Sequence, residues 1–576
     1  MKRFLIVLAC LALLLAGCGK SSDGIDAETA LSEETEGQAD EKIYAVKDSA
    51  PAFTVIYGST DNSENAEYVA SMLKTKTGVT FKVANSPTKV SGGNIIYVGL
   101  HDSVETMYEL YGDSISYDGY GVVYLDGDVY ICGYNSTSVS RAAKKFISCM
   151  VDKHVVKGED GKTAEAYFTK EMFFLSNPGY EIKEPKLLGA DASDYVLVLG
   201  SLPELAVKQV SEIGREIIGK RTGAYVRAVQ KSTDDTRIEL ARGADMELFD
   251  YKISSDGKTV KVEFGGICAL YSAFSELCAL TANDTSGGIL VEKSARDGIL
   301  ANTSLEAGAD VRVMSANVLG TKTGSGYECP TEVRAAIMAE YILAHSPDSV
   351  GFQEFYGDVA SIIKSDLAKK YRTVDFGGGM TATMYLKDKY TVVDKNVIST
   401  RVEETAGDSK AQNYTFTWVL LEDAEGERYI HANLHLEYRS DALRLEQCDM
   451  INAELDKVLA KYPDAALVIT GDYNSKISGN SPIFDAIKGK TESDAGLSIE
   501  CAELCAPEGK RDDDRSSYHS VCSHTDIVTG TPSALDHIMV STDTVDVKLH
   551  KIIYDALICH ASDHCPVIID FARKNV

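Results

Sequence analysis

Polar side chains that can do chemistry stand at the ends of several apolar segments after residue 310. The first segments end on Asn317 and Glu354, and later ones lead to His435 and to the pair Asp472 and Asn474. Alternate positions of an extended chain point to the same side, so Asp472 and Asn474 are predicted to share a face. Functional side chains are commonly held at the edges of a rigid scaffold, and these positions are therefore the first candidates for a site.

Three more candidates follow near the C-terminus. Asp536 lies inside the apolar segment 534–540, and Asp563 and His564 come just before the last apolar segment. A buried carboxylate without a partner costs several kcal/mol, so Asp536 requires one. Each signal alone is weak, because a histidine in an apolar setting is usually structural and an Asp beside Asn after glycine usually forms a turn. Their combination is far more specific.

In this order, the residues resemble the endonuclease/exonuclease/phosphatase superfamily, which includes deoxyribonuclease I, abasic-site endonucleases, inositol polyphosphate 5-phosphatases and bacterial sphingomyelinases. The resemblance spans nearly all of residues 310–573, and Arg444, Gln447 and the pair Tyr518 and His519 resemble the secreted bacterial branch. It implies that residues 308–576 form a four-layer α/β sandwich, with two mixed sheets flanked by helices. The helical periodicity of residues 441–462 agrees with that fold.

The resemblance also implies a divalent metal ion at the site. A hard cation with oxygen ligands neutralises the charge of a phosphate ester and aligns the attack on it. Asn317 and Glu354 fit this role, and Asp563 completes the ligand set in some members. Few thiols or imidazoles converge here, which favours Mg²⁺, with Mn²⁺ or Ca²⁺ as substitutes, over Zn²⁺.

The other five residues receive catalytic roles from the same resemblance. Asp472 would orient and deprotonate the attacking water, and Asn474 would hold the phosphoryl oxygens. His564 would contact the phosphate as general base or as charge stabiliser, with Asp536 fixing its ring. His435 would donate to the equatorial oxygens, where charge accumulates in the transition state.

The N-terminus has the pattern of an export signal. Lys2 and Arg3 precede an apolar run that ends in Leu15-Ala16-Gly17-Cys18. This tetrapeptide resembles the bacterial lipobox, and residues 1–18 are therefore interpreted as a lipoprotein signal peptide with lipidation at Cys18; the alternative is a plain secretory signal. Residues 19–50 are acidic and poor in apolar side chains, which predicts a disordered tether.

Two similar modules are predicted between the tether and the C-terminal domain, over residues 51–175 and 190–304. In both, strand-like and helix-like segments alternate in the same order, with matching glycines in the pairs Gly58 and Gly200, Gly78 and Gly223, and Gly127 and Gly257. The modules loosely resemble accessory domains that precede the barrels of exo-acting glycosidases. That resemblance implies glycan docking, whereas the alternative is a spacer that holds the next domain away from the membrane.

The composition of the chain limits which ligands it could bind and which structural classes it could belong to. The 576 residues carry 58 Lys+Arg against 86 Asp+Glu, and the net charge of −28 argues against non-specific binding to duplex nucleic acid. The 13 cysteines show no zinc-like spacing and no readable disulfide framework, although Cys501 and Cys505 would pair if their geometry allowed. The single tryptophan, Trp418, offers no obvious wedge for membrane insertion.

Together these observations predict a phosphoesterase anchored at the extracellular face of a bacterial membrane. Its expected substrate is a lipid headgroup or a small organic phosphate, ahead of nucleic acid. Two alternatives stay open: a secreted nuclease of the same superfamily, and a non-catalytic surface protein that binds glycan through its N-terminal modules.

Overall fold

The structure is a computed structural model. Two features that the sequence predicts lie outside the residues that it describes. The described residues are 29–30, 42–58, 62–85, 94–99, 116–133, 136–149, 154–169, 173–176, 179–200, 202, 204–234, 236–283, 286–297, 300, 303–320, 329–405, 411–476, 481–494, 498–512, 516–519, 534–555 and 557–574. Cys18 and most of the predicted tether therefore fall outside them.

The first module contains a seven-stranded sheet and a four-stranded sheet. The large sheet has the order β1-β11-β7-β8-β6-β4-β5, and the small one the order β3-β2-β10-β9. The elements are β1 (Thr29–Ala30), β2 (Ile43–Lys47), β3 (Ala50–Pro51), β4 (Phe53–Tyr57), α2 (Ser63–Thr77), β5 (Val83–Ala84), β6 (Asn94–Val98), β7 (Tyr120–Leu125), β8 (Asp128–Gly133), α4 (Ser136–Cys149), β9 (Val155–Lys157), β10 (Thr163–Phe168) and β11 (Phe174–Ser176).

The tether predicted over residues 19–50 is wrong at its C-terminal end. Strand β2 pairs with β10, and its side chains Ile43, Ala45 and Val46 are buried in the core of the first module. The apolar side chains of this short segment are enough to bury one face of a strand, although the acidic residues before it conceal the pattern. The first module therefore includes a segment that the sequence pattern assigns to the tether.

The second module repeats the sheet of the first. Its order, β15-β14-β16-β18-β17-β19, matches β5-β4-β6-β8-β7-β11, with parallel and antiparallel pairs at the same places. The elements are β12 (Lys186–Leu187), β13 (Ala190–Asp191), η5 (Ala192–Asp194), β14 (Val196–Val198), α5 (Leu205–Thr222), β15 (Arg227–Val229), β16 (Arg237–Arg242), β17 (Asp250–Ser255), β18 (Thr259–Phe264), α6 (Ile267–Thr281), β19 (Leu290–Ser294) and η6 (Ala295–Asp297).

The first helix of each module ends in the same way. Gly78 after α2 and Gly223 after α5 have φ values of 74° and 75°, and each amide donates to the carbonyl four residues earlier. Glycine adopts this left-handed conformation without a steric cost. The preceding Thr77 and Thr222 also return their hydroxyls to the last turn at 2.8 and 2.6 Å. The shared Thr-Gly pair in the sequence is thus a helix stop signal.

The C-terminal domain contains two six-stranded mixed sheets. Their orders are β22-β23-β21-β20-β31-β30 and β24-β25-β26-β27-β29-β28. The elements are β20 (Val311–Asn317), α7 (Thr331–His345), β21 (Ser349–Gln353), α8 (Gly357–Leu367), β22 (Tyr371–Thr373), β23 (Ala382–Leu386), β24 (Thr391–Ser399), β25 (Thr415–Glu422), β26 (Arg428–His435), α9 (Asp441–Lys461), β27 (Ala466–Asp472), α10 (Pro482–Asp494), β28 (Ile499–Cys501), α11 (Ala502–Cys505), β29 (Asp536–Ser541), β30 (Val545–Ile552), η7 (Ile558–His560) and β31 (Val567–Arg573).

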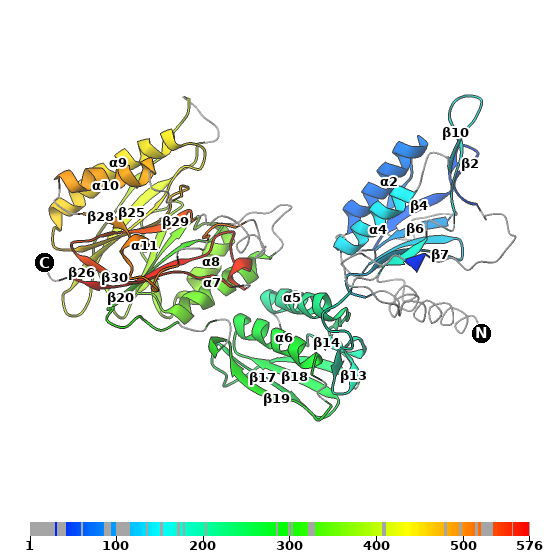
Figure 1. Ribbon diagram of the computed structural model, residues 1–576, viewed down its shortest axis with the longest axis horizontal. Helices are drawn as coiled ribbons and strands as arrows, with labels where there is room; N and C mark the ends of the chain where they lie inside the picture. The colour runs from blue at the N-terminus through cyan, green and yellow to red at the C-terminus, as the bar shows by residue number, and fades with distance from the viewer. Residues whose placement is uncertain are drawn as a thin grey trace.

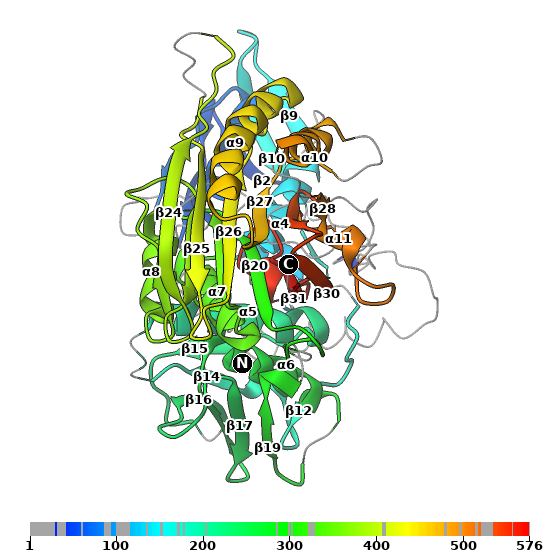
Figure 2. The ribbon, with the colours of Figure 1, turned by 90° about the vertical axis from the view of Figure 1, so that its left-hand side faces the viewer.

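Helices cover the outer faces of this pair of sheets. In Figure 1, α9 and α10 lie on one side and α7 and α8 on the other, and Figure 2 shows strands β24 to β27 side by side next to α9. Apolar side chains of α9, among them Ile451, Leu455 and Leu459, share a buried cluster with Leu434 and Ile469 of the second sheet. The arrangement confirms the predicted α/β class and its sandwich of two mixed sheets flanked by helices.

The contact layer between the two sheets includes buried polar side chains. His431 of β26 lies 2.6 Å from the hydroxyl of Ser349 and 2.9 Å from that of Thr470. Gly351 of β21 faces this group, and a Cβ atom there would lie 2.0 Å from the Thr470 hydroxyl. The glycine in the apolar run before Glu354 is therefore required by the close approach of the second sheet.

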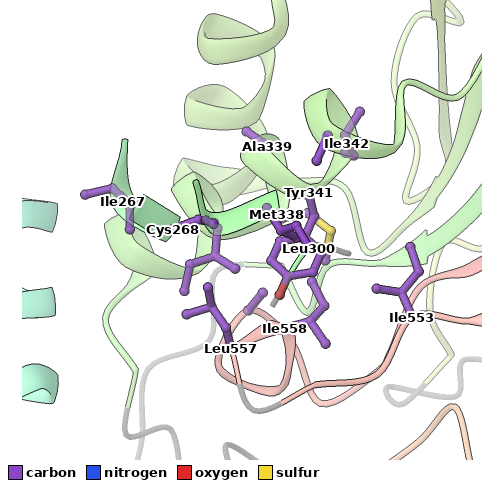
Figure 3. Packing of buried hydrophobic residues seen from close by; sticks show 14 of the residues in the cluster. Ile267, Cys268, Leu300, Met338, Ala339, Tyr341, Ile342, Ile553, Leu557 and Ile558 are labelled. Atoms are coloured by element: carbon purple, nitrogen blue, oxygen red, sulfur yellow. The ribbon is translucent and has the colours of Figure 1, made fainter. Parts of the chain in front are cut away.

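The second module packs directly against the C-terminal domain. The two share one continuous apolar core, and Figure 3 shows Ile267 and Cys268 of α6, Tyr341 of α7 and Ile558 of η7 at this junction. A carboxylate from α7 also completes α6: Glu340 accepts the amides of Ile267 and Cys268, both at 2.7 Å. These amides open the helix and have no acceptor within it.

None of the helices in the described ranges combines the length and the apolar character that a membrane span requires.

Candidate active site

The strands of the C-terminal domain bring the predicted residues to one edge of the sandwich. In the parallel pair β20 and β21, Asn317 is opposite Gln353, so Glu354 follows at the same edge. In the second sheet, Asp472 of β27 is opposite His435 of β26 on one side and Asp536 of β29 on the other. The three form one row across three strands. The pairing register therefore fixes five of the candidate positions.

Asp472 is the meeting point of the site. Its Oδ2 atom accepts a hydrogen bond from the Asn317 amide at 3.1 Å and lies 3.5 Å from Nε2 of His435 and 3.7 Å from Nε2 of His564. Its Oδ1 atom accepts the backbone amide of Asn474 at 2.8 Å. Asp472 is only 2% exposed, so these contacts lie in a weakly screened environment.

His564 is held by a chain of buried hydrogen bonds. Its Nδ1 atom lies 2.7 Å from Oδ2 of Asp536, and that same oxygen accepts the hydroxyl of Ser517 at 2.7 Å. Burial lowers the pKa of His564, but the carboxylates of Asp536 and Asp472 outweigh it and raise the pKa to about 10. The imidazole is therefore cationic at neutral pH and is suited to donate to an anion.

His435 is positioned by an aromatic ring that the sequence did not single out. The ring of Tyr414 packs edge-on against the ring of His435, with centroids 5.1 Å apart. Burial raises the pKa of Tyr414, and the carboxylates of Glu437, Asp472 and Glu354 raise it further, which places all three near this ring. Nδ1 of His435 has no hydrogen-bond partner within the described part of the chain.

The proposed metal ligands supply oxygen atoms at this edge. Asn317 has its amide nitrogen engaged by Asp472, which turns its oxygen away from that carboxylate, and this oxygen also accepts the amide of Leu319 at 3.0 Å. Glu354 is half-buried, with a left-handed φ of 53°. Asp563 is tied to Asn317 through Ser562, whose hydroxyl donates to the Asn317 carbonyl at 2.7 Å and lies 3.4 Å from Oδ1 of Asp563. Amide and carboxylate oxygens of this kind fit a hard divalent cation.

The closest cluster of possible metal-ligand side chains at the site does not contain Glu354 or Asp563. Among His, Cys, Asp and Glu in the described ranges, Asp472, Asp536 and His564 bring ligand atoms within 4.8 Å of one another, whereas Glu354 and Asp563 belong to no such group. The structure therefore brings Asn317, His435, Asp472, Asp536 and His564 together and leaves Glu354 and Asp563 at the margin of the site.

Asn474 belongs to the site but is mainly occupied with its own loop. It has a left-handed φ of 46°, and its amide nitrogen donates to the carbonyl of Leu436 at 2.9 Å. An amide nitrogen carries two hydrogens, so one is left for a substrate oxygen. This hydrogen bond joins the loop after β27 to the loop after β26.

Arg444 and Gln447 lie behind the site and position a loop. Arg444 donates to the carbonyl of Glu437 at 2.7 Å, and Gln447 accepts the amide of Glu437 at 2.6 Å while donating to the carbonyl of Thr400 at 2.8 Å. Both therefore hold the segment that follows His435.

The sequence interpretation missed Ser517, Ser562 and Tyr414. All three act through contacts with residues that are distant along the chain. Serine and tyrosine are common in any loop or strand, and no local spacing marked these three.

No family model matches the chain, and no curated protein matches it. Solved structures do. A mannosyl-6-phosphatase of Bacteroides thetaiotaomicron is 19% identical over 46% of this chain and 100% of its own, with a TM-score of 0.38. An endonuclease/exonuclease/phosphatase family protein of the same organism is 18% identical over 45% and 97%, with a TM-score of 0.38.

The catalytic domain of human Nocturnin, with a bound sulfate anion, is 20% identical over 46% of this chain and 94% of its own, with a TM-score of 0.36. Each likeness covers less than half of the chain.

Proposed function

We propose that the chain is a metal-dependent phosphoesterase that hydrolyses phosphodiester or phosphomonoester bonds by in-line attack of a water activated by Asp472. One observation carries this proposal: a single buried carboxylate is contacted by Asn317, His435 and His564, which come from three different parts of the chain. A carboxylate between two imidazoles can take a proton while the imidazoles face the phosphate.

The side chains divide the work in the following way. Asp472 accepts the proton of the attacking water. His564, kept cationic by Asp536, donates to a phosphoryl oxygen, and His435 donates to a second oxygen. Asn474 contributes its remaining amide hydrogen.

The oxygen ligands Asn317, Glu354 and Asp563 would hold the cofactor, which we propose to be Mg²⁺. When bound, a divalent cation neutralises the ester's charge and polarises the phosphoryl group. Mn²⁺ and Ca²⁺ use the same kinds of ligand and are the expected substitutes.

The pairing of the basic residues favours small or lipid phosphate esters as substrates over nucleic acid. Arg439 is paired with Glu437 at 2.7 Å, Arg444 with Asp441 at 2.6 Å and Lys510 with Glu306 at 2.9 Å. Cations already paired with acids attract a polyanionic backbone poorly. A secreted nuclease therefore remains the second candidate.

We further propose that the enzyme is held at the extracellular face of the bacterial membrane by a lipid on Cys18. The support is the lipobox-like sequence, since Cys18 lies outside the described residues. Glycan binding by the two N-terminal modules is a separate proposal. It is tested by measuring whether the purified protein binds cell-wall or soluble glycans.

The decisive experiment is hydrolysis by the purified protein. Bis-p-nitrophenyl phosphate, phospholipids and plasmid DNA are each offered with Mg²⁺ and with EDTA. We expect metal-dependent hydrolysis that falls about a hundredfold or more in Asp472→Ala, because the group that activates water is lost. Exclusive cleavage of plasmid DNA would favour the nuclease. Inactivity on all three substrates, together with glycan binding, would favour the non-catalytic alternative.

A further inference from the structure

A second cluster of metal-binding side chains lies beside the loop that carries His564. His519, Cys559 and Cys565 each offer one ligand atom, and these atoms all lie within 4.8 Å of one another. The three residues are buried, with exposed fractions of 2%, 1% and 1%. None of them takes part in the hydrolysis proposed above.

The backbone already holds the three residues in place. The amide of His519 donates to the carbonyl of Asp563 at 2.9 Å, and the amide of Cys565 donates to the carbonyl of Ser517 at 2.7 Å. Cys559 lies in the short helix η7. The ligands thus come from positions 519, 559 and 565, a spacing that no zinc-binding sequence pattern would reveal.

The donor set is of the soft type. Two thiols and one imidazole suit Zn²⁺, whereas the oxygen ligands at the active site suit Mg²⁺. In a tetrahedral site with Zn–S bonds of about 2.3 Å, two sulfur ligands lie about 3.8 Å apart. The three ligand atoms lie within 4.8 Å of one another, which is close enough for one ion to contact all three.

The surroundings also favour a cation. Asp555 interacts electrostatically with Cys559 and Cys565, and its Oδ1 atom is fixed by the hydroxyl of Tyr341 at 2.6 Å. The carboxylate of Asp555 disfavours negative charge on either sulfur, although the hydrogen bonds of Cys559 with Cys565 and His519 outweigh it there and lower the pKa of Cys559 to about 6. A dication removes that penalty, because metal binding and thiol deprotonation occur together.

We propose that His519, Cys559 and Cys565 bind one Zn²⁺ ion, separate from the catalytic metal, that fixes the two segments carrying Ser517 and His564. Three protein ligands leave the fourth tetrahedral position to solvent or to a further side chain. The ion is a structural one. It steadies the active site because Ser517 and His564 both contact Asp536.

The first test is the zinc content of the whole protein, measured by inductively coupled plasma mass spectrometry. The protein is purified in the presence of a thiol reductant and Mg²⁺. We expect roughly one zinc per chain in the wild type and almost none in Cys559→Ser combined with Cys565→Ser. Cys132→Ser removes a buried thiol in the first module and serves as the matched control. Asp472→Asn shows whether zinc occupies the catalytic site instead, and it should keep its zinc. Zinc retained in the double serine variant, or lost in Asp472→Asn, overturns the proposal.

A second test does not depend on variants that fold. Zinc is removed from the wild type with a chelator and replaced by Co²⁺. Thiolate-to-cobalt charge-transfer bands and the strong d–d bands of a tetrahedral ion are expected. If these bands do not appear while both thiols still react with an alkylating reagent, the proposed zinc site is wrong. The proposal is also wrong if the protein mass is two hydrogens lower and Cys559 is linked to Cys565, because that would show a disulfide. Neither readout requires turnover, so the zinc proposal and the proposed phosphoesterase activity fail independently.

Discussion

His564 and Asp536 form one unit at the scale of single residues. Asp536 lies 2.7 Å from the ring of His564 and contacts no reacting atom in the proposed reaction, so it is a positioning residue. Its whole effect passes through the orientation and charge of the imidazole. Loss of the imidazole should therefore make Asp536 nearly irrelevant to turnover.

A double-mutant cycle tests this coupling. We expect His564→Ala to lower kcat about a hundredfold or more and Asp536→Asn to lower it about tenfold or more. The double variant should resemble His564→Ala alone, because residues that act as a unit are not additive. kcat is measured with saturating Mg²⁺, and Asp485→Asn, exposed on α10, is the control. Losses that simply multiply would contradict the assignment.

At the scale of elements, helix α6 is completed by a residue of another domain. Glu340 on α7 accepts two amides at the start of α6, and both partners are buried in the junction. A carboxylate at a helix N-terminus also interacts favourably with the helix dipole. The contact therefore joins the second module to the C-terminal domain.

Removing this helix cap should lower the free energy of unfolding. Glu340→Ala leaves two buried amides without an acceptor, and we expect the free energy of unfolding to fall by at least about 2 kcal/mol. Glu332→Ala, on the same helix, loses only one 3.3 Å contact from Gln209 and should cost less than about 1 kcal/mol. Urea unfolding followed by circular dichroism compares the two. Equal, small losses would show that the cap does not stabilise the junction.

The polar layer between the two sheets gives the C-terminal domain a pH dependence. Burial lowers the pKa of His431 to about 3, so its ring is neutral in the folded protein, while in the unfolded chain it titrates near 6.5. Between these values the unfolded state binds more protons, and stability falls as the pH is lowered. His345 and His537, with pKa values lowered by burial to about 3 and about 4, act in the same direction.

The contribution of His431 to the pH dependence of the free energy of unfolding can be measured with one variant. Each such histidine contributes up to about 1.4 kcal/mol per pH unit to the free energy of unfolding. We expect His431→Gln to have a shallower slope between pH values of about 7 and 4.5 than the wild type. Ser349→Ala loses the same hydrogen bond but keeps the titrating ring, so its slope should be unchanged. Urea unfolding is followed by the fluorescence of Trp418, the single tryptophan, which is buried in the C-terminal domain. An unchanged slope in His431→Gln would refute the assignment.

At the scale of the whole molecule, the predicted anchor precedes two modules of one design and the C-terminal domain. The second module shares its core with the C-terminal domain, whereas the core of the first module is separate. In this arrangement the proposed lipid lies at the opposite end of the chain from the proposed active site.

The anchor is tested by fractionation. We expect Cys18→Ala to move the exported protein from the membrane fraction to the soluble fraction, because the thiol that carries the lipid is lost. Cys10→Ala, also within the signal region, is the matched control and should leave the partitioning unchanged. Membrane association that survives Cys18→Ala would count against lipidation.

The sequence alone determined the features that depend on local patterns. Short apolar segments marked the strands, matching glycines marked the two modules, and polar residues at the ends of apolar segments marked Asn317, His435, Asp472 and His564 as candidates. It missed strand β2, because that strand is short and follows an acidic segment.

Only the tertiary structure decided which distant residues meet. Asn317 and Asp472 are 155 positions apart, and Glu340 is 73 positions from the amide of Ile267 that it caps. Strand register and the packing of whole elements set such contacts, and neither leaves a periodic trace in the chain. For the same reason Tyr414, Ser517 and the cluster of His519, Cys559 and Cys565 became visible only after the sheets and loops were placed in three dimensions.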